Sequence, residues 1–453
     1  MGFALSTFYL FVAYLGTETV FGPLAPYRLE FVLALSIFLV SLPLLPTSNI
    51  IKSPQSLALI GLGFAVPFSV AVSGWIGGAL QAFNGFIPCA FAYFLVCLHC
   101  NSKKKLIILI VALEVVCFFV ILKGSLELRA VGGDAPSPAL LDESSYLLAQ
   151  RSDQGEWFYR LRGQHFMNDP NDFAQFLVCM VPMAFALWRP KKTMRNIGLV
   201  ILPVCILLYG AFLTHSRGSL LALVVLAAAA ARKRIGRVAS LITAGAIFMG
   251  ASVLGFTGGR EISAESGSDR TALWSSGLQL LKSHPLFGVG FGRMPDYTGL
   301  TAHNSIVVCA AELGITGLFF WSLFVLPSIR DAMAIASPLK VHESEPMRIV
   351  EPLVPSPPLQ SAPIERTEIN RLGGLVLLSL IGFLVTGWFL SRAYAMTLFL
   401  LGGIAEVIFQ IAADRGMIAP RLQLGPALRY SGMLAVSLIL AMYVLLRVTN
   451  LTR

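Results

Sequence analysis

Long apolar segments recur along the whole chain, and short polar or basic connectors separate them. A helix that spans a bilayer needs about 20 mostly apolar residues, because each residue adds about 1.5 Å of rise. Thirteen segments meet this requirement to within a few residues, at 3–21, 28–46, 56–73, 80–99, 106–122, 172–188, 196–213, 218–231, 238–257, 304–327, 373–391, 395–411 and 431–447. The pattern predicts an all-α, polytopic transmembrane helical protein with about 12–13 spans.

The polar stretches between the spans divide the chain into membrane and aqueous parts. The parts are N-terminal transmembrane helices at 1–122, an extracytoplasmic loop at 123–171, central transmembrane helices at 172–257, an extracytoplasmic catalytic loop at 258–303, a transmembrane helix at 304–327, a cytoplasmic linker at 328–372 and C-terminal transmembrane helices at 373–453. The linker is Pro-rich, mixed in charge and without periodicity, which is typical of a flexible connection.

Basic residues cluster in three connectors, at 101–105, 189–195 and 232–237. Lys and Arg favour the cytoplasmic side of a membrane protein, so these connectors are expected inside the cell. Alternating the spans from them puts the N-terminus in the cytoplasm and the turn at 214–217 outside, together with both long loops. The pattern leaves the side of the C-terminus open.

Composition supports a membrane protein and argues against other classes. The chain of 453 residues is 56% hydrophobic and only 13% charged, with a mean hydropathy of +0.75. The net charge of +10 lies in short connectors without interleaved stacking aromatics, so no nucleic-acid partner is expected. The seven cysteines lie in or beside apolar runs, and their spacing implies neither a disulfide framework nor a Cys/His zinc site.

Polar residues that could carry chemistry gather in the segments expected outside. The segment before residue 172 holds Arg162, His165 and Asn171, and the turn "THSRGS" holds His215 and Arg217. Snorkelling to the interface explains many single arginines at a membrane boundary. Arg217 is harder to explain in this way, because it lies in a very short turn on the side that should be poor in arginine.

The loop at 258–303 supplies further candidates. "SGSDRTALWSSGLQLLKSHP" has Trp274, Leu278 and Leu281 at helical spacing, which predicts an amphipathic helix with Arg270 in its first turn. A glycine-rich loop with Arg293 follows, and it lacks the strand that a dinucleotide-binding loop requires.

The next span opens with His303 and Asn304, and Glu312 follows within it. The imidazole of a histidine is neutral or easily deprotonated near pH 7, which suits a general base. A histidine at a membrane boundary is, however, more often a structural residue that makes hydrogen bonds. A guanidinium fork can bind phosphate, and two of them suit a diphosphate, which makes Arg217 and Arg270 the candidate pair. Among the intramembrane carboxylates, Glu114 and Glu406 are expected to make polar contacts between helices.

Three blocks of this sequence resemble the O-antigen ligase and O-antigen polymerase superfamily. The main block is "RTALWSSGLQLLKSHPLFGVGFGRMPDYTGLTAHNSIVVCAAELGITGLFFW", with an Arg-Trp helix, a Pro-Leu-x-Gly-x-Gly turn and His-Asn before Glu-Leu-Gly. "SRGS" at 216–219 and "NDPNDFAQF" at 168–176 are similar to two further blocks in the same order. His303 and Gly314 have ten residues between them, the spacing of the ligases.

The resemblance implies a membrane glycosyltransferase of the GT-C type, in the bacterial inner membrane with its active site facing the periplasm. Its donor would be a glycan on undecaprenyl diphosphate, and its acceptor a hydroxyl of lipid A-core or another lipid or glycan. By this resemblance Arg217 and Arg270 would hold the diphosphate, and His303 would orient or deprotonate the acceptor. The family needs neither a metal nor a nucleotide sugar, so the resemblance implies no metal and no cofactor.

Several functions remain open at this point. A polymerase would extend a lipid-linked glycan with the same donor site, and a protein O-oligosaccharyltransferase would change only the acceptor. A membrane transporter would instead need two related halves and coupling carboxylates deep in the bilayer. The outer polar residues and the absence of evident kinship between the halves argue against transport.

Overall fold

The structure is a computed structural model, and it describes residues 1–16, 28–45, 50–131, 141, 144–152, 155–253, 256, 264–337, 362–418, 421 and 423–451. The expected linker at 328–372 therefore lies largely outside the described residues. So do the ends of the expected spans at 3–21, 28–46 and 238–257, and the first residues of the expected catalytic loop.

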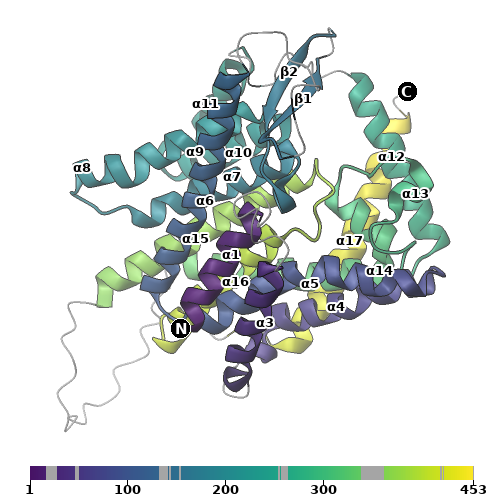
Figure 1. Cartoon of the computed structure of the whole chain (residues 1–453), viewed down its shortest axis with the longest axis horizontal. Coiled ribbons are helices and arrows are strands. Elements are labelled where there is room, and N and C mark those ends of the chain that lie inside the picture. Colours follow the sequence, from purple (N-terminus) through teal and green to yellow (C-terminus); the bar gives the residue numbers. More distant parts are fainter. Residues whose placement is uncertain are drawn as a thin grey trace.

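Helices make up almost all of the described structure (Figure 1). The α-helices are α1 Gly2–Leu15, α3 Leu29–Ser41, α4 Pro54–Val72, α5 Ile76–His99, α6 Lys103–Ala130, α7 Pro170–Ala184, α8 Thr193–Asn196, α9 Leu202–Leu213, α10 Arg217–Ile235, α11 Arg237–Val253, α12 Ala264–Ser283, α13 Met294–Thr298, α14 Ser305–Ala336, α15 Ala362–Gly387, α16 Met396–Asp414 and α17 Leu424–Leu451. Short turns of other helical types are η2 Leu42–Leu44, η3 Ile50–Lys52, η5 His165–Met167, η6 Phe185–Leu187 and η7 Ile197–Ile201.

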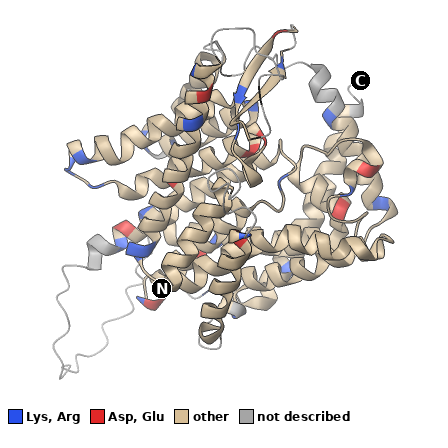
Figure 2. Ribbon diagram, viewed as in Figure 1, with Lys and Arg blue, Asp and Glu red and all other residues tan. Residues whose placement is uncertain are grey.

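Within the described residues, nine helices are long and apolar enough to cross a membrane, and three further apolar helices are shorter. Much of the helical surface carries no charged side chain, as a lipid environment requires (Figure 2). The all-α polytopic fold expected from the sequence is confirmed. Several helices run past their expected ends; among them, α10 continues to Ile235 and α14 to Ala336.

The segment expected as a loop at 123–171 contains regular structure. Helix α6 continues into it as far as Ala130, and an antiparallel hairpin follows, formed by β1 Leu147–Arg151 and β2 Trp157–Leu161. The sequence of β2, "WFYRL", is rich in the aromatic residues that favour strands. Two strands of five residues are too short for a clear alternating pattern, so the hairpin was not predicted.

Two of the three basic connectors contact the start of α15. Glu368, near the start of α15, forms ion pairs with Lys103 and Arg189. In the same region, Arg371 donates a hydrogen bond to the carbonyl of Trp188 at 2.6 Å. Two connectors expected on the cytoplasmic side therefore lie together in the fold.

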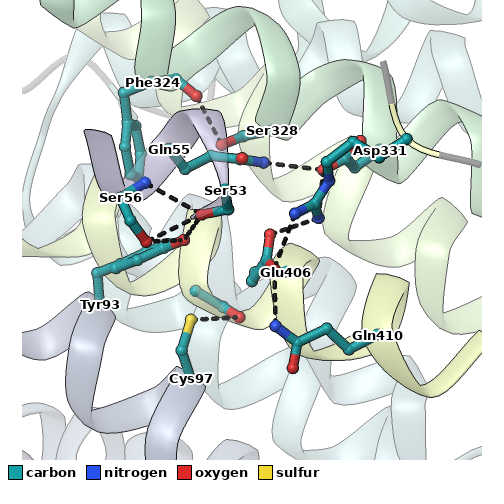
Figure 3. Close-up of polar contacts among 12 residues, drawn as sticks. Ser53, Gln55, Ser56, Tyr93, Cys97, Phe324, Ser328, Asp331, Glu406 and Gln410 are labelled. Carbon is teal, nitrogen blue, oxygen red and sulfur yellow. Dashed lines mark hydrogen bonds and ion pairs between the residues drawn. The ribbon is translucent and has the colours of Figure 1, made fainter. Parts of the chain in front are cut away.

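A buried polar network joins α4, α14 and α16 (Figure 3). Arg421 donates to Glu406 at 2.6 Å and to Asp331 at 3.0 Å, and Gln55 donates to Asp331 at 2.8 Å. Gln410 donates to the other oxygen of Glu406 at 2.8 Å. Glu406 thus makes the kind of contact between elements that the sequence predicts, with an arginine that follows its own helix.

Candidate functional site

Helix α14 is interrupted at Gly314, and the interruption receives the glycine-rich loop. Gly314 has φ 65° and ψ −160°, a conformation available almost only to glycine. The break leaves the carbonyls of Ala311 and Glu312 open to outside donors, and they accept the N–H groups of Val289 at 2.9 Å and Gly290 at 3.0 Å. On the far side of the break, Ile315 donates to the carbonyl of Pro285 at 2.8 Å.

The backbones of the loop and the helix approach so closely that neither Gly288 nor Gly314 could carry a side chain. A Cβ on Gly288 would lie 2.3 Å from the carbonyl carbon of Glu312, and one on Gly314 would lie 2.5 Å from that of Leu286. The Pro-Leu-x-Gly-x-Gly turn and the Glu-Leu-Gly segment are therefore each other's packing partners. Glu312 itself is 4% exposed, and backbone N–H groups of Gly292 and Met294 bond to its carboxyl group.

The loop before α14 places His303 beside two other elements. Trp274 of α12 donates its indole N–H to the carbonyl of Ala302 at 2.8 Å, which ties the loop to the amphipathic helix. The backbone N–H of His303 donates to the hydroxyl of Ser391 at 2.9 Å. The side chain of His303 remains exposed.

Asn304 acts as the N-cap of α14. Its side-chain oxygen accepts the N–H groups of Ile306 at 2.9 Å and Val307 at 3.1 Å. Its amide group donates to the carbonyl of Trp388 at 3.1 Å. An N-cap of this kind satisfies the otherwise unpaired donors of the first helical turn and orients the residue before it.

Three of the candidate histidines share an uncommon backbone conformation. His165, His215 and His303 have φ values of 52°, 47° and 48°, in the left-handed region. Such residues cost free energy, on the order of 1–3 kcal/mol, and they concentrate at functional sites. Arg28 and Lys191 have the same conformation at φ 46° and 61°, so the strain is not confined to the candidate histidines.

Arg217 and Arg270 come together around Phe389. Arg217 begins α10, and the adjacent Gly218 would place a Cβ 3.5 Å from the Cβ of Phe389. The guanidinium of Arg270, in the second turn of α12, lies 5.8 Å from the centre of the Phe389 ring. Burial and the positive charge of Arg217 lower the pKa of Arg270, as expected for two neighbouring cations.

The pKa of His303 depends on its partial burial and on the charges of Arg270 and Asp169. Partial burial and the positive charge of Arg270 lower the pKa of His303, while the negative charge of Asp169 raises it and so offsets part of the effect. The structure therefore brings Arg217, Arg270 and His303 near one another, although they come from three different elements.

The β-hairpin supports the turn that carries Arg217. Arg160 of β2 is 3% exposed and donates to the carbonyl of Thr214 at 2.8 Å and to the side chain of Asn171 at 2.9 Å. The imidazole of His215 lies 3.3 Å from the carbonyl of Phe256 and within ring contact of Phe158. Asn171 and His215, both expected to bind substrate, thus have protein partners.

Three further candidates lie outside the arginine pair. Arg162 donates to the side chain of Asn168 at 2.9 Å. Arg293 contacts Asp296 at 3.0 Å and the hydroxyl of Ser73 at 2.8 Å. His165 lies 3.9 Å from Glu30 and lines a separate groove between α1, α3 and α5.

A cavity of about 300 Å³ lies beside the His303 loop. Its polar lining includes Asp172, Gln175, Glu312, Ser391 and Arg392. Arg392 forms an ion pair with Asp172. Burial is the largest single effect and lowers the pKa of Arg392, but the charge of Asp172, its hydrogen bond and the charge of Asp169 together outweigh burial and raise that pKa. Sequence reasoning missed both Ser391 and Arg392, because the short loop between α15 and α16 carries no motif.

The candidate site combines arginines, hydroxyls, an imidazole and two carboxylates. Among the residues that the structure describes, no group of three or more His, Cys, Asp or Glu side chains is arranged to hold a metal ion.

Comparison with known proteins identifies one family. Residues 202–322 match a family model described as O-antigen ligase, and this stretch runs from α9 into α14. It contains Arg217, Arg270 and His303 as well as the glycine loop and its binding site at Gly314. No curated protein matches the chain at a significant level. Residues 202–322 are therefore similar to the O-antigen ligase family, in a chain whose described residues form nine helices long and apolar enough to cross a membrane.

Proposed function

We propose that this protein is a membrane glycosyltransferase that moves a glycan from undecaprenyl diphosphate to an acceptor hydroxyl. The observation that carries the proposal is the convergence of Arg217 and Arg270 beside His303. The family supports a lipid-linked glycan as the substrate. The site would face the periplasm from the inner membrane, since the basic connectors belong to the opposite side.

The two arginines suit a diphosphate leaving group. In transfer, the bond between the anomeric carbon and the diphosphate oxygen breaks, and the acceptor oxygen forms the new bond to that carbon. The departing diphosphate gains negative charge, which two guanidinium groups neutralise through bidentate hydrogen bonds. This supply of fixed positive charge serves the purpose for which other transferases use a metal ion, so activity should persist in a chelator.

His303 suits the removal of the acceptor proton. The lowered pKa keeps its imidazole neutral at pH 7, so that a ring nitrogen is available to accept the proton of the attacking hydroxyl. The exposed side chain beside a polar cavity leaves room for an acceptor sugar. Asn304 has a structural role, because its side chain caps α14 and so positions the backbone of the His303 loop.

Among family activities, we favour a ligase that acts on lipid A-core or a similar acceptor. The spacing between His303 and Gly314 supports the ligase. A polymerase that extends a lipid-linked glycan would use the same arginines and differ in its acceptor.

The test is to size the lipid-linked glycans that accumulate in cells lacking the protein, before and after complementation. A ligase predicts long unattached chains on undecaprenyl diphosphate, and a polymerase predicts single repeat units. Complementation with Arg217→Gln, Arg270→Gln or His303→Ala should fail although the protein reaches the membrane. Lys104→Gln, an exposed cation at the opposite end, is the matched control and should restore transfer. A glycan profile unchanged by deletion would overturn the proposal.

A further inference from the structure

A groove of about 870 Å³ lies between α12, α14 and α17, and the proposed reaction does not use it. Its walls are mainly apolar, with Leu278 and Leu281 from α12 and Ile439 and Leu440 from α17. Sites of this size, about 300–1,000 Å³, bind small molecules in many proteins. The groove has room for part of a lipid.

Two basic side chains from different elements line the same groove. Lys282 comes from the last turn of α12, and Arg447 comes from the last turns of α17. Nε of Arg447 donates to the hydroxyl of Tyr443 at 3.3 Å, and its guanidinium lies 5.9 Å from the centre of that ring. Tyr443 therefore orients the side chain of Arg447 along α17, where both residues line the groove.

The charged side chains that line the groove are both positive. No acidic side chain lines it among the residues that the structure describes. Lys282 belongs to the helix that carries Arg270, so the pair lies on the side expected outside the cytoplasm, where basic residues are infrequent. A single cation at this position could simply extend toward the membrane surface, but this does not explain why two cations from different helices line the same groove.

The groove opens toward the surrounding lipid. Less of α17 is buried than of any other candidate span, and Leu440 and Tyr443 are exposed. At the other side, Leu446 packs in one apolar cluster with Trp274 and Ala302, the residue before His303. The groove is thus continuous with the bilayer and adjacent to the scaffold of the His303 loop.

We propose that this groove binds one anionic glycerophospholipid from the bilayer. An acyl chain would lie against Leu278, Leu281 and Leu440, and the phosphate would lie between Lys282 and Arg447. The apolar walls and the acid-free pair of cations match the two parts of such a lipid. The proposal does not depend on the proposed transferase activity.

Native mass spectrometry of the purified full chain, stripped of lipid in neutral detergent, tests the proposal. Phosphatidylglycerol is titrated as the probe, with phosphatidylcholine as the zwitterionic lipid and glycerol phosphate as a headgroup without chains. Because both cations that would face the phosphate are lost, the double variant Lys282→Gln/Arg447→Gln should bind phosphatidylglycerol roughly thirtyfold more weakly. Leu440→Trp should also weaken binding by filling the groove while the charge is unchanged.

The matched control is Arg429→Gln, an exposed arginine at the opposite end of α17, and it should bind as the unaltered protein does. Equal affinity for phosphatidylcholine would overturn the proposal, and so would unchanged binding by the double variant. Competition by glycerol phosphate at the same concentration would show a phosphate site in place of a lipid site. If the double variant is unstable, Lys282→Gln alone and Leu440→Trp decide the question.

Discussion

The hydroxyl of Ser391 accepts a hydrogen bond from the backbone N–H of His303 at 2.9 Å, across 88 residues of sequence. Ser305 strengthens the same junction, because its hydroxyl donates to the carbonyl of Leu390 at 2.7 Å and accepts the N–H of Arg392 at 3.1 Å. The loop between α15 and α16 therefore positions the proposed general base, although it lies outside the matched family region.

Ser391→Ala should lower transfer while leaving donor affinity unchanged. The substitution removes one neutral hydrogen bond, worth about 1 kcal/mol, and this corresponds to roughly a fivefold loss of kcat with little change in KM for the donor. Steady-state kinetics with a lipid-linked donor measure both constants. Ser337→Ala, which removes a hydroxyl at the far end of α14, is the control. An equal loss in both variants would contradict a positioning role for Ser391.

The pH dependence of transfer should report the charges around His303. Asp169 raises the pKa of His303, so Asp169→Asn should lower that pKa further. If neutral His303 is the base, the acidic limb of the kcat/KM profile moves to lower pH in the variant. Relative activity under mildly acidic conditions then rises.

Asn is well suited to this test because it preserves the local structure. Asp169 caps α7 by accepting the N–H of Asn171 at 2.7 Å, and an Asn side chain can accept the same bond. A limb that stays in place, or moves to higher pH, would remove His303 from the role of base.

Gly314→Ala should destabilise the protein by more than about 2 kcal/mol, because the residue has a conformation that alanine rarely adopts. The new Cβ would also meet the backbone at Leu286. Thermal unfolding in detergent measures the change. Gly63→Ala is the control, since a Cβ on this helical glycine meets nothing within 4 Å. Equal unfolding temperatures for the two variants would count against the docked loop.

Arg421→Gln should be among the most destabilising substitutions in the chain. It leaves the buried carboxylates of Glu406 and Asp331 without their cation (Figure 3), and breaking a buried ion pair costs about 3–5 kcal/mol. Unfolding of the purified protein measures the loss, with Arg429→Gln as the exposed control. Adding Glu406→Gln and Asp331→Asn to Arg421→Gln should recover much of the stability, and failure of this rescue would point to packing instead of charge.

The sequence by itself predicted the polytopic membrane fold and the three blocks that resemble the O-antigen ligase family. Helices must satisfy their own backbone hydrogen bonds in lipid, so long apolar runs reveal spans without any knowledge of their neighbours. The order of the three family blocks likewise singled out Arg217, Arg270 and His303.

Only the tertiary structure decided how these residues are held. The contact of Gly290 with Glu312 and that of His303 with Ser391 join segments that no local periodicity connects. The same is true of Arg160, whose partners Thr214 and Asn171 lie in other elements. Hydropathy shows whether a segment lies in lipid or in water. A hydrogen bond between distant loops depends instead on how the helices pack, which only the folded structure shows.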